Sequence, residues 1–152
     1  MYDTRPISQF IGDDEEDDKL LKEMAEEAKN WLLKKNICSE VKDIHFGEGV
    51  GGIFASFLFK IQTDSEDREK FIWVVCGDIP THYFDIDDER IRDGEQAIMH
   101  YSELLVGWIE GVRSKKPFEC EVDVGVPPTI EWTNNLTKRL NFIAKYFMGE
   151  LN

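Results

Sequence analysis

The sequence has few of the residues and spacings that mark metal and redox sites. It contains only three cysteines, Cys38, Cys76 and Cys120, an odd number with no CxxC spacing. Such a set is typical of reduced thiols in a cytosolic protein rather than of a disulfide framework. The three histidines are scattered and form no HxxxH or HExxH pattern. We therefore expect no metal and no cofactor.

Long apolar runs and phosphate-binding loops are also absent. No stretch approaches the roughly 20 apolar residues that span a bilayer, and residues 1–5 lack the pattern of a secretory signal. We expect a cytoplasmic protein without membrane segments. The glycines at positions 47–52 precede a strand pattern and no Lys-Ser/Thr pair, so they indicate a flexible hairpin. Residues 85–89 are acidic but lack the glycine and the terminal glutamate of a calcium loop.

Basic residues are scarce relative to acidic ones: 18 against 31, which gives a formal net charge of −13. Like charge opposes the phosphate contacts that dominate nucleic-acid binding and docking on anionic membranes, so neither partner is expected. Two interpretations of the charge remain. The simpler one is solubility, because net charge bears on solubility before it bears on partners. The other is a negative surface directed at a basic protein partner. The oligomeric state stays open.

Three segments have the periodicity of amphipathic helices. Six consecutive acids at positions 13–18 suit a first helical turn, and apolar residues then recur at three- and four-residue spacing from Leu20 to Leu32. A second stripe runs from Ile98 to Val112, behind a capping signal at Asp93. A third helix is expected after the two prolines at positions 127 and 128.

Strand patterns lie between the first and second helices. Residues 41–46 suggest a short strand, and residues 53–62 alternate well. The six apolar residues at 71–76 run without a break, which is typical of a central strand covered on both faces. A short edge strand is expected around residues 82–84. This order of elements predicts an α+β fold in which an antiparallel sheet of three to four strands is packed by three helices.

The length of 152 residues fits one domain, because domains cluster at about 100–150 residues. No internal repeat, low-complexity tract or linker divides the chain. We expect a loosely ordered N-terminal arm over residues 1–12 and a single α+β domain over residues 13–152.

The most informative stretch is residues 71–84, where the apolar run leads into a group of polar side chains. A central strand delivers the segment after it to the edge of the core, where polar groups can be held rigidly. Asp78 could serve as a general base or ligand, with Thr81 beside it, and His82 as a proton carrier near neutral pH. Cys76 could be a nucleophile if His82 lowered the pKa of its thiol.

The segment Trp73-Val74-Val75-Cys76-Gly77-Asp78-Ile79-Pro80-Thr81-His82-Tyr83 resembles the hallmark of a bacterial family of small proteins of unknown function. Members carry a tryptophan-rich strand followed by a Gly-Asp-Leu-Pro-Thr-Asp-Tyr type of motif. The order downstream is similar too, with Trp108 in a helix and Val126-Pro127-Pro128 before the last helix. The resemblance runs from about Trp31 to the C-terminus. It implies one compact bacterial domain and no assigned activity. The family more often has Asp at position 82, which implies that His82 is not an obligatory base.

The same residues also have structural interpretations, and the sequence favours these. Asp78, close before a proline, fits a carboxylate that accepts hydrogen bonds from its own turn. Cys76 fits a small buried hydrophobe, and Tyr83 a packed ring whose hydroxyl has one partner. Trp132 begins the last helix and is the tryptophan expected to be partly exposed. There it would act as an interaction hot spot, although core packing is the simpler interpretation.

Two functional classes remain. The first is a non-enzymatic acidic interaction module, an immunity-like inhibitor or adaptor that covers a basic partner. The charge, the small size and the lack of a catalytic constellation favour it. The second is a small enzyme or ligand-binding domain with a site around Asp78, Thr81 and His82. The candidate binding residues are Asp78, Thr81, Tyr83 and Trp132.

Overall fold

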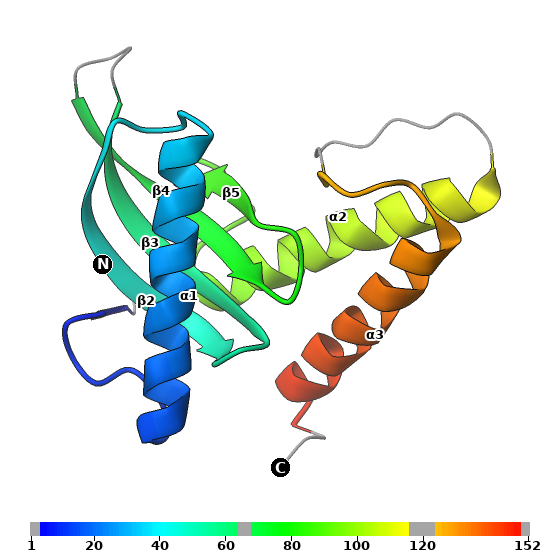
Figure 1. Cartoon of the computed structure of the whole chain (residues 1–152), viewed down its shortest axis with the longest axis horizontal. Coiled ribbons are helices and arrows are strands. Elements are labelled where there is room, and N and C mark those ends of the chain that lie inside the picture. The colour runs from blue at the N-terminus through cyan, green and yellow to red at the C-terminus, as the bar shows by residue number, and fades with distance from the viewer. Residues whose placement is uncertain (1–3, 64–67, 116–123, 150–152) are drawn as a thin grey trace.

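A computed structural model of the chain describes residues 4–63, 68–115 and 124–149 (Figure 1). Within these residues it contains a five-stranded antiparallel sheet, in the order β1-β2-β3-β4-β5, and three helices. The strands are β1 (Arg5–Pro6), β2 (Glu40–Val50), β3 (Phe54–Thr63), β4 (Arg68–Gly77) and β5 (His82–Asp85). The helices are α1 (Glu15–Lys34), α2 (Gly94–Ser114) and α3 (Ile130–Phe147). The predicted α+β class is confirmed, and the sheet has one strand more than the expected maximum of four.

The additional strand is β1, which lies in the segment expected to be a loosely ordered arm. Its two residues pair antiparallel with β2, and the N–H of Ile7 then donates to Ile44 O at 3.1 Å. Ile11 is only 2% exposed and joins the apolar cluster beneath α1. The segment is therefore held at two points, to the sheet through residues 5–7 and to the α1 core through Ile11.

α1 covers one face of the sheet. Its predicted apolar stripe is buried, and α1 lies across the strands in Figure 1. The stripe packs on every second residue of β3 and β4, from Ala55 to Ile61 and from Ile72 to Cys76. Because a strand directs alternate side chains to opposite faces, the residues between them belong to a second core.

The second core lies on the opposite face, where α2 covers the sheet and α3 packs on α2. Figure 1 shows α2 behind the strands and α3 returning from its far end. Trp73 and Val75 of β4 belong to this core, whereas Ile72, Val74 and Cys76 belong to the first. Residues 72–76 of the predicted run 71–76 are therefore buried, as expected for a central strand, and Phe71 at its start is partly buried.

The C-terminal half of α3 reaches the sheet at Phe54, the first residue of β3. The centroid of the Phe54 ring lies 5.3 to 6.4 Å from the centroids of three aromatic rings of this helix. These rings belong to Phe142, Tyr146 and Phe147. The aromatic contacts attach the second helical layer to one end of the sheet.

The glycine-rich segment at 47–52 belongs to the hairpin between β2 and β3, as expected, but the first strand continues past residue 46 into the glycines. Residues 47–50 are the end of β2, and only residues 51–53 form the turn. Close packing of α2 explains the glycine at position 47, because a Cβ on Gly47 would lie 3.0 Å from Gly94 Cα and a Cβ on Gly94 would lie 2.8 Å from Gly47 Cα. Ser56 Oγ donates to Gly94 O at 2.9 Å and accepts from Glu48 N at 3.2 Å, so the contact is also polar.

The helix starts follow local signals. Asp14, Asp93 and Thr129 each accept a hydrogen bond from the backbone N–H three residues later, at 2.8, 2.8 and 3.2 Å. No helix in the described ranges is long and apolar enough to cross a bilayer. Cys120 lies outside the described residues.

Candidate functional site

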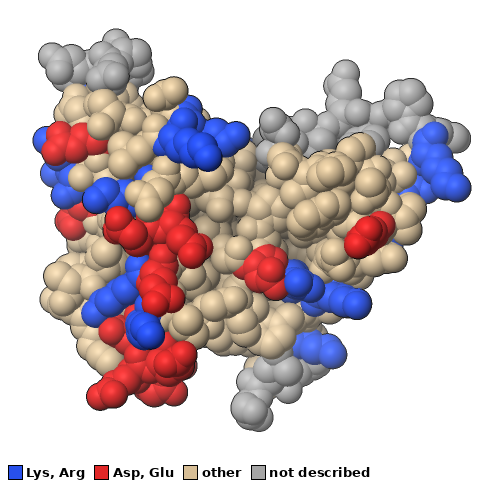
Figure 2. Space-filling model, in the orientation of Figure 1, with Lys and Arg blue, Asp and Glu red and all other residues tan. Residues whose placement is uncertain are grey.

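A groove runs between α1 and the start of α3, with the turn between β4 and β5 as its floor. Three adjoining cavities of about 270, 220 and 590 Å³ form it. Figure 2 shows the corresponding hollow in this face of the molecule. α1 lines the groove with residues at helical spacing: Leu20, Glu23, Met24, Glu27, Trp31 and Lys35. Val126 and Trp132 lie on the opposite side.

Four of the predicted site residues line this groove, but they do not form one cluster: Asp78, Thr81, His82 and Trp132. Thr81 and His82 line the largest cavity, beside Trp31 and Lys35 at the end of α1. Asp78 lines the two smaller cavities instead. The chain therefore brings Thr81 and His82 together, as their neighbouring positions require, and separates Asp78 from them.

Asp78 does not bond to its own turn as the sequence suggested. Its Oδ2 forms an ion pair with Nε of Arg139, on α3, at 2.6 Å. The N–H of Asp78 donates to Ile53 O at 2.8 Å. The Asp78 and Arg139 side chains are 56% and 36% exposed, and ion pairs at such sites contribute about 0–1 kcal/mol. The carboxylate is thus partly neutralised by a guanidinium, which is unfavourable for a general base.

His82 faces α2 and packs among aromatic rings. Its imidazole stacks on Tyr101 with ring centroids 5.3 Å apart, and Phe84 meets it edge-on at 4.9 Å. Tyr101 in turn donates its hydroxyl to Pro80 O at 2.7 Å. This packing holds the imidazole and the turn in a fixed relation.

Cys76 lies on the other face of the sheet, beneath α1. His82 pairs with Val75, whose side chain is in the α2 core, whereas Cys76 belongs to the α1 core. The thiol is 4% exposed, and burial together with the nearby Glu27 carboxylate raises its pKa to about 12. The structure therefore does not bring Cys76 and His82 together, and it disfavours the thiolate that a nucleophile needs.

The remaining two candidates, Tyr83 and Trp132, differ in their relation to the groove: Trp132 lines it, whereas Tyr83 is not among the residues that line its three cavities. Tyr83 faces α1, where its ring meets Trp31 edge-on at 6.4 Å. Trp132 is half-buried and lines the 220 Å³ cavity with Asp78 and Val126. Its position allows contact with both the core and a bound molecule.

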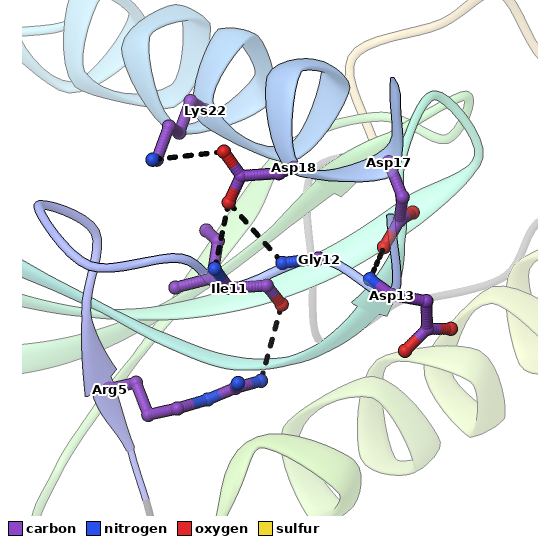
Figure 3. Close-up of polar contacts among 7 residues, drawn as sticks. All are labelled: Arg5, Ile11, Gly12, Asp13, Asp17, Asp18 and Lys22. Carbon is purple, nitrogen blue, oxygen red and sulfur yellow. Dashed lines mark hydrogen bonds and ion pairs between the residues drawn. The ribbon is translucent and has the colours of Figure 1, made fainter. Parts of the chain in front are cut away.

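Several acids before and within α1 have structural roles that the sequence did not reveal (Figure 3). Asp18 Oδ1 accepts hydrogen bonds from Ile11 N at 2.7 Å and Gly12 N at 3.3 Å, and Oδ2 pairs with Lys22 at 3.0 Å. The bond from Ile11 is the main cause that lowers the pKa of Asp18. Arg5 also donates to Ile11 O at 3.2 Å, a bond within the arm, and the bonds of Ile11 N and Gly12 N to Asp18 attach the arm to α1.

Asp17 connects the start of α1 to the hairpin between β2 and β3. Its carboxylate accepts from Gly51 N at 2.6 Å and from Asp13 N at 2.8 Å, the latter drawn in Figure 3. Together with the cap Asp14, three of the six consecutive acids therefore stabilise the fold.

The acidic side chains that α1 presents to solvent are a different set. Within the described part of the chain none of them takes part in an ion pair, and red atoms cluster over this half of α1 in Figure 2. We define them as the α1 acidic surface: Glu15, Glu16, Glu23, Glu26 and Glu27. Residues 13–27 as a whole contain nine acids and two lysines, so much of the net charge is concentrated there.

The acidic stretch at 85–89 is arranged differently. Asp88 binds the Arg90 guanidinium at 2.8 and 2.9 Å, and these hydrogen bonds lower the pKa of Asp88 to about 2. Among the described residues no group of three or more His, Cys, Asp or Glu side chains is arranged to hold a metal ion.

Comparisons with family models, with curated proteins and with solved structures found no match to this chain. The resemblance to the bacterial motif family stays a prediction.

Proposed function

We propose that the protein is a non-enzymatic acidic interaction module, an immunity-like inhibitor or adaptor that binds a basic protein partner. The α1 acidic surface carries this proposal. Five exposed carboxylates stand on one helix, and no ion pair within the described residues offsets them. Such a surface attracts a basic partner, accelerates association and disfavours acidic competitors.

The anchoring of α1 supports a binding role. The opposite face of the helix is buried, with Leu21 and Leu32 fully inaccessible. The hydrogen bonds of Asp17 and Asp18 fix its first turn to the hairpin and to the arm. A rigid surface loses little conformational freedom on binding, which favours affinity.

The contacts of the catalytic candidates favour binding over nucleophilic chemistry. Asp78 is paired with Arg139, and the pKa of the Cys76 thiol is raised to about 12. His82 and Cys76 lie on opposite faces of the sheet.

The test is affinity capture from the native host with the wild-type chain and two charge-matched variants. The first variant replaces the five glutamates of the α1 acidic surface by Gln. The control replaces five exposed glutamates elsewhere: Glu89, Glu95, Glu103, Glu110 and Glu131. Each variant changes the formal net charge from −13 to −8.

We expect one stoichiometric basic partner that is captured by the wild type and the control. The α1 variant should lose it. Equal capture by both variants, or a partner without excess positive charge, would contradict the proposal.

A second candidate function, the binding of a small molecule, is favoured by the 590 Å³ cavity. Lys35, Thr81 and His82 offer polar groups there, and Trp31 offers an apolar surface. This combination suits a small anionic ligand with an apolar part. Thermal-shift measurements with aromatic carboxylates and phosphates test it. We expect stabilisation that is lost in T81A and in K35A, whereas no shift with any such compound would argue against it.

A further inference from the structure

The two smaller cavities of the groove adjoin one another and differ in chemistry. The acidic cavity, about 270 Å³, is lined by Leu20, Glu23, Met24, Glu27, Gly52, Gly77 and Asp78. The apolar cavity, about 220 Å³, is lined by Gly77, Asp78, Ile79, Pro80, Val126 and Trp132. Both include Gly77 and Asp78, so a single bound segment can reach both.

The acidic cavity has the chemistry of a pocket for Lys or Arg. Three of its lining residues carry carboxylates, and none of its described lining residues is basic. Leu20 and Met24 add apolar surface beside Glu23 and Glu27. A long basic side chain can pack its aliphatic stem on such surface while its charged head group binds carboxylates. Arg139 pairs with Asp78, which leaves the glutamates of α1 for the incoming cation.

The apolar cavity is suited to a neighbouring hydrophobic side chain. Four of its six lining residues have apolar side chains: Ile79, Pro80, Val126 and Trp132. A half-buried tryptophan next to a charged cavity is the kind of residue that dominates binding energy at interfaces.

We propose that the groove binds a linear segment of the basic partner, with one Lys or Arg side chain in the acidic cavity and an adjacent apolar side chain in the apolar cavity. Charge complementarity selects this occupant over an acidic or a purely apolar segment. The inference rests on the proposed function and extends it from a charged surface to a defined site.

The test uses a short synthetic peptide of alternating Arg and Leu, with a peptide of alternating Arg and Ser as its control. Binding is measured by calorimetry and by the fluorescence of the groove tryptophans Trp31 and Trp132. The informative variants are E23Q/E27Q and E15Q/E26Q. Both remove two charges from exposed positions of α1, but only the first pair lines the groove.

We expect E23Q/E27Q to weaken binding of the Arg-Leu peptide by about ten-fold, because two charge contacts of about 0–1 kcal/mol each are lost. E15Q/E26Q should weaken binding by less than about three-fold, which is half of that effect on a logarithmic scale. The Arg-Ser peptide should bind about ten-fold more weakly than the Arg-Leu peptide, because it leaves the apolar cavity empty.

Equal weakening by the two variants would mean diffuse attraction to α1 and would overturn the groove site, while the proposed function would stand. Absence of binding of the Arg-Leu peptide to the wild type would also overturn the groove site. The capture experiment with the five-glutamine variants judges the proposed function separately, so the two failures can be distinguished.

Discussion

The thiol of Cys76 should be about a thousand-fold less reactive than an ordinary cysteine. Burial, together with the Glu27 carboxylate, raises its pKa from 9.0 to about 12. Only the thiolate attacks an alkylating reagent, so at pH 8 a rise of this size lowers the reactive fraction about a thousand-fold. The 4% exposure adds a requirement for local opening before the reagent can enter.

The assay is alkylation with iodoacetamide at several pH values, with the labelled Cys76 peptide quantified by mass spectrometry. The urea-unfolded chain gives the reference rate, and His82→Gln is the informative variant. We expect slow labelling in the native protein and the same rate in H82Q, because the imidazole lies on the other face of the sheet. Fast native labelling that slows in H82Q would refute the reasoning and restore the thiolate–imidazole pair.

Three further predictions concern stability. Phe54→Ala should lower the free energy of unfolding by about 3–5 kcal/mol in urea denaturation, because it removes the ring that three aromatic side chains of α3 contact; a loss below about 1 kcal/mol would count against this attachment. Gly94→Ala should lower the free energy of unfolding by about 1–3 kcal/mol through overpacking. Gly107→Ala should be neutral or stabilising, because its Cβ would meet nothing within 4 Å. Equal effects of the two substitutions would contradict the close approach of α2. The pKa of Asp88 is lowered to about 2 by Arg90, so its ionised form stabilises the fold above the unfolded pKa near 3.8, and that contribution is lost as the pH falls toward 2. D88N should therefore flatten the acid-side loss of stability between about pH 4 and 2, and an unchanged pH profile would argue against the ion pair.

The helices were predictable because their signals are local. The capping residues Asp14, Asp93 and Thr129 act on N–H groups three residues away. The apolar stripe of α1 repeats within a few residues as well. The central strand was equally clear, because two covered faces require an unbroken apolar run, and residues 72–76 supply it.

The edge strand β1 and the end of β2 were harder to predict, because backbone hydrogen bonding between strands requires no particular side-chain pattern. β1 is two residues long and pairs through its main chain. The glycines at 47–52 indicated a hairpin turn, but Gly47 lies within β2 and is glycine because α2 packs closely against the strand there. Composition alone does not distinguish these two causes.

Only the part of the candidate site that is formed by residues adjacent in sequence could be predicted. Thr81 and His82 share a cavity because they adjoin in sequence. The ion pair of Asp78 with Arg139 joins the β4–β5 turn to α3, and the bond of Asp17 to Gly51 joins residues 34 positions apart. Such contacts depend on how the layers pack, and no local pattern indicates them.

The measurement that tests the central claim most directly is the dissociation constant of the captured partner as a function of salt concentration. It is made for the wild type and for the two five-glutamine variants, whose net charges are equal. We expect the affinity for the partner to fall steeply with increasing salt concentration for the wild type and the control. Replacement of the α1 acidic surface should weaken binding at low salt and make it almost independent of salt. Identical salt dependence in the two variants would contradict the claim that this surface binds the partner.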